Sequence, residues 1–377
     1  MANLRVPISG QVTGREEIRN VMRVALSQHY GGGAWTDLFE RLFADYMGAR
    51  DAVLCNSGSS ALLLAMSSID LPPGSKVLTS AVNFPTTVNA IIQRGFTPVF
   101  VDNDPKTLNA VDVEIDVGDI RAIVLAHSLG NPVDLTHYAK YRIPIIEDCC
   151  DAIGSTINGR MVGRVGIMAT ASFYPAHHMT MGEGGAVLTD SPKLKRILES
   201  YRDWGRDCWC APGEDNTCGK RFDYDYDHKY TYSRIGYNLK ANDFAAAVGV
   251  AQVDRLEGFG QKRRANWQYL REELDSLPIE FIEPTYGSDP SWFGFAFLVE
   301  ERNKLARYLD EHGVGNRPIM AGNILRQPAY RNIAHHVIGN LDGANKIHEQ
   351  GLWIGVFPGI TEEMRAYQAE TIRAYFS

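Results

Sequence analysis

The chain has 377 residues, of which 45% are hydrophobic and 10% aromatic, so it can bury the core of a large globular protein. Its 38 Lys and Arg residues and 45 Asp and Glu residues give a net charge of −7, and it has no basic run, which argues against nucleic-acid binding. We expect a cytoplasmic protein, because no apolar run approaches the roughly 18 residues of a membrane span and the opening MANLRVPISG lacks a signal-peptide pattern.

Short apolar runs alternate with segments of helical period through the first half of the chain. Predicted strands lie at 52–55, 76–80, 98–101, 122–126 and 144–147, and predicted helices at 61–69 and 87–94 follow the first two. Two further strand-like runs, at 167–174 and 185–189, precede a predicted helix at 192–202. This alternation predicts an α/β protein with a mostly parallel, doubly wound sheet.

The segment 203–237 differs in character from what precedes it. It contains three cysteines, many Tyr and Asp residues and little apolar periodicity, so we predict a long ordered loop there. Helical period returns at Asp243, and mixed strand and helix patterns continue to the end. We therefore expect a large domain over 1–255, including the loop, and a smaller C-terminal α/β domain over 256–377.

The first candidate binding site lies in LCNSGSSALLLAM, residues 54–66. Gly58 permits a sharp turn after a strand, and Ser59 and Ser60 begin a predicted helix. Free backbone N–H groups and hydroxyls at such a helix start can bind a phosphate. A serine cap beside a structural glycine explains the same residues, and the sequence leaves both interpretations open.

A second candidate, Asp148, ends the apolar strand in IPIIEDCCDAIGS, residues 143–155. Ligands in α/β sheets bind at the carboxyl ends of strands. An acid at that position either is solvated or holds a protonated heteroaromatic nitrogen, as the Asp that partners pyridoxal phosphate does.

The third segment is TASFYPAHHMTMGEGGAVLTD, residues 170–190. It resembles the sugar aminotransferase branch of the fold type I pyridoxal phosphate enzymes, in which a serine is followed five residues later by the cofactor-binding lysine. Ser172 plus five is His177, and no lysine occurs between 170 and 190. Histidine exchanges a proton near neutral pH but cannot bind an aldehyde as lysine does, so the resemblance implies untethered pyridoxamine phosphate (PMP/PLP). The alternative is an inactive relative in which His177 and His178 are structural.

Four cysteines form a candidate metal site. They are separated by 57, one and seven residues, and they are Cys150, Cys208, Cys210 and Cys218. Four thiolates can hold an iron–sulfur cluster. A zinc site is the main alternative, but its cysteine pairs are usually two to four residues apart.

This spacing, together with FYPAHHMTMGEGGAV, resembles the nucleotide-sugar 3-dehydrases within the DegT/DnrJ/EryC1/StrS sugar aminotransferase family. The resemblance covers nearly the whole chain and implies a large domain with a mostly parallel seven-stranded sheet. It places Gly58, Ser59 and Ser172 at the cofactor phosphate, Phe84 on the face of the ring and Asp148 at the ring nitrogen.

Further roles come from the same resemblance. It implies that Asp151 contacts the cofactor at a position that marks dehydrases, and that Asn238 reaches a phosphate in the neighbouring subunit of a homodimer with shared active sites. It assigns a [2Fe–2S] cluster to the four cysteines, with [4Fe–4S] as the alternative. His177 would move a proton at the cofactor, and Tyr174 would help to position the adduct.

The implied reaction is loss of the C3 hydroxyl of a nucleotide-linked 4-keto-6-deoxyhexose, with a CDP-sugar favoured over a TDP-sugar. An NAD(P)H-dependent flavin or iron–sulfur reductase would supply two electrons. Two rival functions stay open. One is a cluster-free GDP- or TDP-sugar 3-dehydratase that regenerates its amine from glutamate, and the other is a non-catalytic B6-binding relative.

Overall fold

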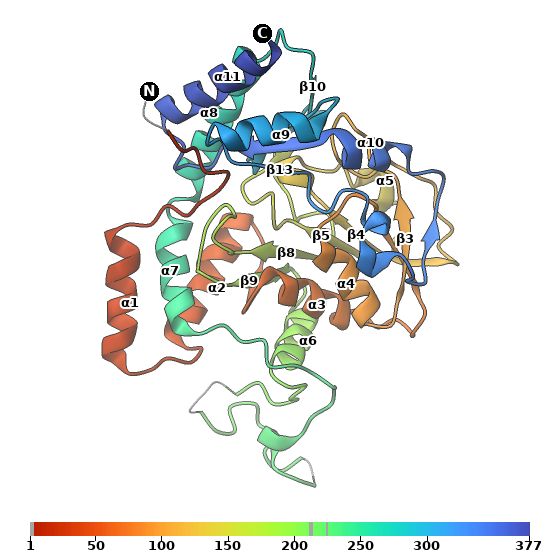
Figure 1. The fold of residues 1–377 in the computed structure, drawn as a ribbon. Coiled ribbons are helices and arrows are strands. Elements are labelled where there is room, and N and C mark those ends of the chain that lie inside the picture. Colours follow the sequence, from red (N-terminus) through yellow and green to blue (C-terminus); the bar gives the residue numbers. More distant parts are fainter. Residues whose placement is uncertain (1–3, 211–213, 224) are drawn as a thin grey trace.

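The computed structural model describes residues 4–210, 214–223 and 225–377 (Figure 1). A central sheet lies between helices, a second group of strands and helices forms the top of the view, and the loop 203–237 extends below helix α6 (Pro192–Arg202). No helix in the described part of the chain is long and apolar enough to cross a membrane.

The described residues form an eight-stranded central sheet in the order β1-β9-β8-β5-β4-β2-β3-β14. Its strands are β1 (Asp51–Cys55), β2 (Lys76–Ser80), β3 (Thr97–Val101), β4 (Ile120–Ala126), β5 (Ile145–Asp148), β8 (Met168–Ser172), β9 (Gly185–Thr189) and β14 (His336–Val337). β9 is antiparallel to both of its neighbours, and the other pairs are parallel. The expected mostly parallel sheet is confirmed, but it has eight strands in the described residues and not the expected seven, because β14 adds one at the edge. The two-residue β14, which comes from the C-terminal part, is too short to leave a periodic signal.

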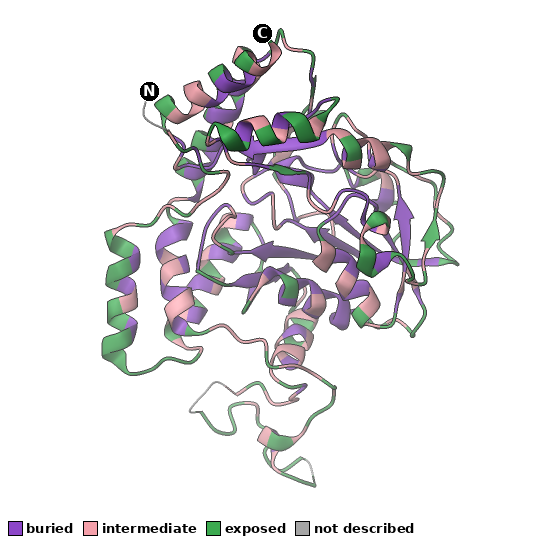
Figure 2. Ribbon diagram, viewed as in Figure 1, coloured by how far each residue is buried: buried purple, intermediate pink, exposed green. Residues whose placement is uncertain are grey.

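Helices bury both faces of this sheet, which explains its continuously apolar strands (Figure 2). On β1, Val53 and Cys55 belong to the cluster under α3, whereas Ala52 and Leu54 face the cluster of α2 and α7. The flanking helices are α1 (Arg15–Ser27), α2 (Ala34–Met47), α3 (Gly58–Ser68), α4 (Pro85–Gln93), α5 (Thr136–Ala139), α6 and α7 (Asp243–Val253).

The C-terminal part contains a second sheet in the order β10-β12-β15-β13. Its elements are α8 (Leu256–Glu273), β10 (Glu280–Phe281), β12 (Gly294–Leu298), α9 (Arg302–Glu311), β13 (Asn316–Pro318), α10 (Asp342–Gln350), β15 (Gly351–Gly355) and α11 (Glu362–Phe376). A small third sheet joins β6 (Thr156–Ile157), β7 (Arg160–Met161) and β11 (Ser288–Asp289).

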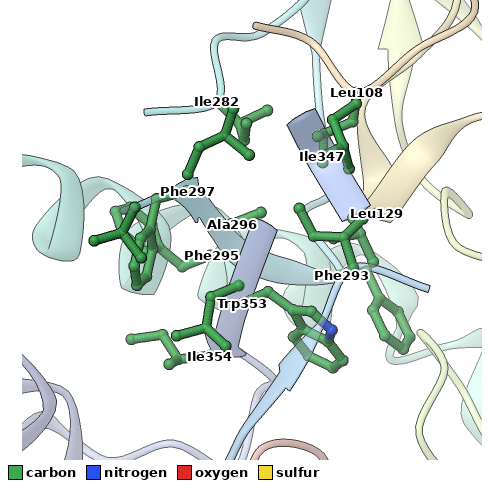
Figure 3. Packing of buried hydrophobic residues seen from close by; sticks show 14 of the residues in the cluster. Leu108, Leu129, Ile282, Phe293, Phe295, Ala296, Phe297, Ile347, Trp353 and Ile354 are labelled. Atoms are coloured by element: carbon green, nitrogen blue, oxygen red, sulfur yellow. The ribbon is translucent and has the colours of Figure 1, made fainter. Parts of the chain in front are cut away.

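One hydrophobic core connects the two parts of the chain. Phe293, Phe295 and Trp353 of the C-terminal part pack in the same cluster as Leu108 and Leu129 of the first part (Figure 3). The predicted division at residue 255 coincides with the junction between α7 and α8. Because the core is shared, that division into domains stays a prediction.

The segment 203–237, hereafter the cysteine loop, has little regular structure in its described residues. Its elements are the short 3-10 helix His228–Tyr230 and backbone bridges of Asp203 with Asn238 and of Arg206 with Tyr232. The bridges bring the two ends of the loop together beside α6. The segment is therefore a long loop whose two ends are paired. The sequence analysis predicts a long loop here.

Candidate active site and metal centre

The start of α3 forms a cradle for an anion. Ser57 caps the helix, because its hydroxyl accepts a hydrogen bond from the Ser60 N–H at 3.1 Å. The N–H groups of Gly58 and Ser59 lie in the first helical turn, where the helix provides no acceptors and its dipole is positive. A Cβ atom at Gly58 would lie 2.6 Å from the Cβ of Ser172. The structure thus brings together all three residues that were predicted to bind phosphate.

This close packing gives a first prediction. Gly58→Ala should lower the free energy of unfolding by roughly 1–3 kcal/mol, because the new methyl group overlaps Ser172. Urea unfolding measures the change. The matched control is Gly258→Ala, since Gly258 is a helical glycine with open space around its Cβ position. Equal unfolding midpoints for the two variants would contradict the close contact.

Asp148 ends β5 and is 5% exposed. Its carboxylate accepts hydrogen bonds from the Thr87 hydroxyl at 2.7 Å and from the Cys150 N–H at 3.2 Å. Thr87 lies on α4, one turn after Phe84, whose side chain is 56% exposed. A fixed carboxylate below an open aromatic face can hold a protonated pyridine ring. Sequence reasoning had not assigned Thr87, although it lies only three residues after Phe84.

His177 lies next to Asp151, with 3.8 Å between His177 Nε2 and Asp151 Oδ1. Burial lowers the pKa of His177 to about 4, although the charge of Asp148 opposes this shift. Burial and repulsion from Asp148 raise the pKa of Asp151 to about 7. His177 is therefore neutral at physiological pH and can accept a proton.

A buried arginine that sequence reasoning missed fixes the backbone at His177. The Arg263 guanidinium, on α8, donates to the His177 carbonyl at 3.0 Å and to the carbonyls of Trp292 and Phe293 at 3.2 Å. Arg263 is fully buried, and burial lowers its pKa to about 9. A single arginine in an amphipathic helix normally indicates a solvated face, so no signal in the sequence identified it.

Tyr174 and Asn238 lie nearer the surface. Tyr174 is 50% exposed, and its ring centre lies 6.1 Å from that of His177 in an edge-on arrangement. Asn238 is exposed where the cysteine loop returns, and the next residue, Leu239, accepts a hydrogen bond from the Asn56 N–H beside the cradle. The predicted contact of Asn238 with a second subunit stays a prediction.

Together these residues fit PMP. The cradle offers free N–H groups to a phosphate, Asp148 offers a buried carboxylate that could pair with a ring nitrogen, and the buried Nδ1 atom of His177 has no hydrogen-bond partner in the described residues. An unpartnered buried nitrogen is costly unless a ligand completes the site.

The cysteine loop contains a separate group of metal-binding side chains. The donor atoms of Cys208, Cys210, Cys218 and His228 all lie within 4.8 Å of one another. The thiols of Cys208, Cys210 and Cys218 are free, and so is that of Cys150. Although burial opposes the shift, hydrogen bonds from the Thr217 side chain and the Cys218 N–H lower the pKa of Cys210 to about 6, which favours a thiolate ligand.

Cys150, the predicted fourth ligand, lies apart from this group in the described part of the chain. Its sulfur lies 3.2 Å from the Cβ position at Gly58, and its N–H donates to Asp148. The reason is that β5 ends at Asp148, so the chain turns in beneath the cradle. The role of Cys150 as a metal ligand stays a prediction.

Comparisons with known proteins found one family and several relatives of high coverage. A model of the DegT/DnrJ/EryC1/StrS aminotransferase family matches residues 11–373. The lipopolysaccharide biosynthesis protein RfbH of Salmonella typhimurium is 45% identical over 98% of this chain and 92% of its own length. A dTDP-4-dehydro-2,6-dideoxy-D-glucose 3-dehydratase of Saccharopolyspora spinosa is 44% identical over 97% of this chain and 86% of its own.

One solved structure is informative for the site. The E. coli GDP-4-keto-6-deoxy-D-mannose-3-dehydratase with bound hydrated PLP superposes with a TM-score of 0.89. The match covers 99% of this chain and 100% of that one, at 27% identity. The expected fold type I architecture is therefore confirmed.

Proposed function

The chain belongs to the DegT/DnrJ/EryC1/StrS aminotransferase family, and from this premise we propose that it is a PMP-dependent 3-dehydratase of a nucleotide-linked 4-keto-6-deoxyhexose. Its relatives include nucleotide-sugar 3-dehydratases and aminotransferases. The observation that carries the proposal is His177: a neutral base lies in the cofactor site at the position where aminotransferases have their lysine. Of the possible substrates, we favour a CDP-sugar.

Different residues of the site would bind the cofactor and transfer the proton. Bound PMP would supply an amine for the 4-keto group and a ring that accepts electrons. Gly58, Ser59 and Ser172 would bind its phosphate, and Asp148 would keep its ring nitrogen protonated. The His177 imidazole would accept a proton from the cofactor carbon and could return it to the C3 hydroxyl as that group leaves as water.

We also propose that the cysteine loop carries a redox centre, with [2Fe–2S] favoured by resemblance, that receives electrons from an external NAD(P)H-dependent reductase. Thiolates and imidazole are both known ligands of iron–sulfur centres, so the donors present suit this role. The proposed enzyme is a homodimer in which Asn238 completes the partner's phosphate site. The rival is a cluster-free 3-dehydratase, represented by the GDP-4-keto-6-deoxy-D-mannose 3-dehydratase of Yersinia pseudotuberculosis, which is 30% identical.

The choice between these two functions gives a second prediction. Anaerobically purified protein with PMP should deoxygenate a CDP-4-keto-6-deoxyhexose over many turnovers when a reductase and NADH are added. With glutamate and no reductase it should form no deoxygenated product, because the proposed route requires two electrons and uses no amino donor. Product and NADH are measured together. Sustained turnover with glutamate and no reductant would favour the cluster-free enzyme instead.

A further inference from the structure

The end of β1 is held by a buried ion pair that the proposed function does not use. β1 is the edge strand of the central sheet in the described residues, so alternate residues direct their N–H and C=O groups away from β9. At Leu54, side chains bind both of these outward groups. The Leu54 N–H donates to Glu40 Oε1 at 2.8 Å, and the Arg202 guanidinium donates to the Leu54 carbonyl at 3.0 Å. The ion pair therefore takes the place of a neighbouring strand at this position.

Glu40 and Arg202 also bind each other. Arg202 Nη1 lies 3.3 Å from Glu40 Oε1, and the two side chains are 15% and 16% exposed. The Asp203 carboxylate accepts a further hydrogen bond from Arg202 Nε at 2.9 Å. Replacing a buried ion pair by apolar residues is often neutral for stability, so stability alone does not explain this pair. What apolar residues could not provide is the fixed geometry of the backbone at Leu54.

The backbone that follows Leu54 leads directly to the phosphate cradle. The Asn56 N–H donates to the Leu239 carbonyl at 2.9 Å, and Asn56 Oδ1 accepts from the Ser60 hydroxyl at 2.6 Å. Ser60 lies in the first turn of α3, and its N–H donates to the Ser57 hydroxyl that caps this helix. A shift of Leu54 therefore displaces the residues that set the direction of the free N–H groups of the cradle.

The same ion pair lies at the base of the cysteine loop. Arg202 is the last residue of α6, which leads into that loop (Figure 1). The Arg202 carbonyl accepts a hydrogen bond from the Leu239 N–H at 3.1 Å, at the point where the loop returns. One arginine thus contacts the strand before the cradle with its side chain and the returning end of the loop with its backbone.

We propose that Glu40 and Arg202 are positioning residues for the cofactor phosphate, and that they connect the cradle to the base of the cysteine loop. The inference rests on the cofactor site of the proposed function, but not on the reaction that takes place there. Because coupling between two sites is reciprocal, a cofactor that orders the cradle should also order the base of the loop.

The first experiment measures the affinity of full-length variants for PMP and, as a probe of the cradle alone, for inorganic phosphate. We expect Arg202→Met and Glu40→Leu each to weaken both by roughly tenfold, within the range typical of coupling between sites. Glu40→Gln keeps an acceptor oxygen for the Leu54 N–H and should weaken binding less than Glu40→Leu does. The matched control is Arg255→Met, which breaks another ion pair, of 2.8 Å with Glu17, and should keep the wild-type affinity.

The double variant Glu40→Leu/Arg202→Met separates positioning from charge compensation. It leaves neither member of the pair as a buried charge without its partner, so its unfolding temperature should rise above those of the single variants. Its affinity for PMP should stay as low as theirs, because Leu54 still lacks its two partners. Recovery of PMP affinity together with stability would overturn the inference, and so would wild-type affinity in both single variants.

Hydrogen exchange tests the connection to the loop. In wild-type protein, PMP should slow exchange in peptides that cover residues 54–60 and 237–241. In Arg202→Met, at saturating PMP, the effect on 237–241 should be lost. Protection of 237–241 that persists in this variant would come from another contact, such as the proposed one of Asn238 with a second subunit, and would overturn the connection.

The outcomes also separate the inference from the proposed function. If the variants lose PMP affinity as expected but the wild-type protein dehydrates no nucleotide sugar, the inference stands and the proposed function is wrong. If the wild-type protein dehydrates its substrate and the variants bind PMP normally, the reverse holds. Wild-type protein that binds neither PMP nor phosphate would overturn both.

Discussion

Replacing His177 with asparagine should slow dehydration by about 10²–10⁴-fold, the contribution typical of a positioned acid–base group. Asparagine keeps a polar side chain of similar size but cannot accept a proton at neutral pH. Because the Arg263 guanidinium holds the carbonyl of residue 177, the backbone should stay in place. Release of ¹⁸O-labelled water from a substrate labelled at its C3 hydroxyl, with saturating PMP and no reductase, measures the chemical step alone.

His178→Asn is the matched control for this prediction. His178 is buried beside His177, but its Nε2 contacts the Ser291 carbonyl at 2.6 Å rather than the cofactor site. We expect that variant to keep its rate within tenfold of wild type. A third variant, His177→Lys, should lose dehydration and gain a covalent, borohydride-reducible link to pyridoxal phosphate. Unchanged dehydration in His177→Asn would remove His177 from the role of base.

The pH profile tests the same assignment. Because burial lowers the pKa of His177 to about 4, the base stays neutral as the pH falls through 6.5, and its protonation should lower the rate only near pH 4. Asp151, whose pKa is raised to about 7, can add a step near neutrality, and Asp151→Asn should abolish that step alone. A loss of rate centred at 6.5 in Asp151→Asn would show that His177 is solvated and not held as described.

Periodicity predicts elements that are buried by their neighbours in sequence. The strands β1, β2, β4 and β5 fall at the expected positions because each is a short apolar run between helices that cover both faces of the sheet. The strand β14 could not be predicted in this way. It consists of two exposed residues, and it pairs with β3 only because the C-terminal part folds back over the sheet.

The residues of the site likewise fall into those that local sequence predicts and those that it does not. The phosphate cradle and Asp148 follow from where strands end, which the sequence shows directly. Arg263 and His228 do not, because their roles depend on partners far along the chain or on the path of an irregular loop. Spacing between cysteines likewise does not determine which thiols meet: Cys150 precedes a turn that takes it to the cradle instead of to the other three.

Asp148→Asn should reduce the single-turnover rate by about 10²–10³-fold, as loss of a preorganised electrostatic partner does. An amide does not stabilise a positive charge on the ring nitrogen, so the ring becomes a poorer acceptor of electrons. The fold should survive, since the amide oxygen can still accept the hydrogen bond from Thr87. Cofactor affinity and the absorption of the bound cofactor, measured together with the rate, separate weaker binding from slower chemistry.

Thr87→Val provides a graded companion to Asp148→Asn. It removes one hydrogen bond of 2.7 Å to the carboxylate and leaves the charge, so the loss should be about five- to tenfold, the effect of roughly 1–1.5 kcal/mol. Thr170→Val removes only a 3.4 Å contact with the same carboxylate and should have a smaller effect. We therefore expect the loss of rate to be largest in Asp148→Asn, smaller in Thr87→Val and smallest in Thr170→Val. This order is expected if Asp148 acts through its charge and not through its packing. If all three variants lost activity equally, the carboxylate would be acting through structure, and the ring nitrogen would need another partner.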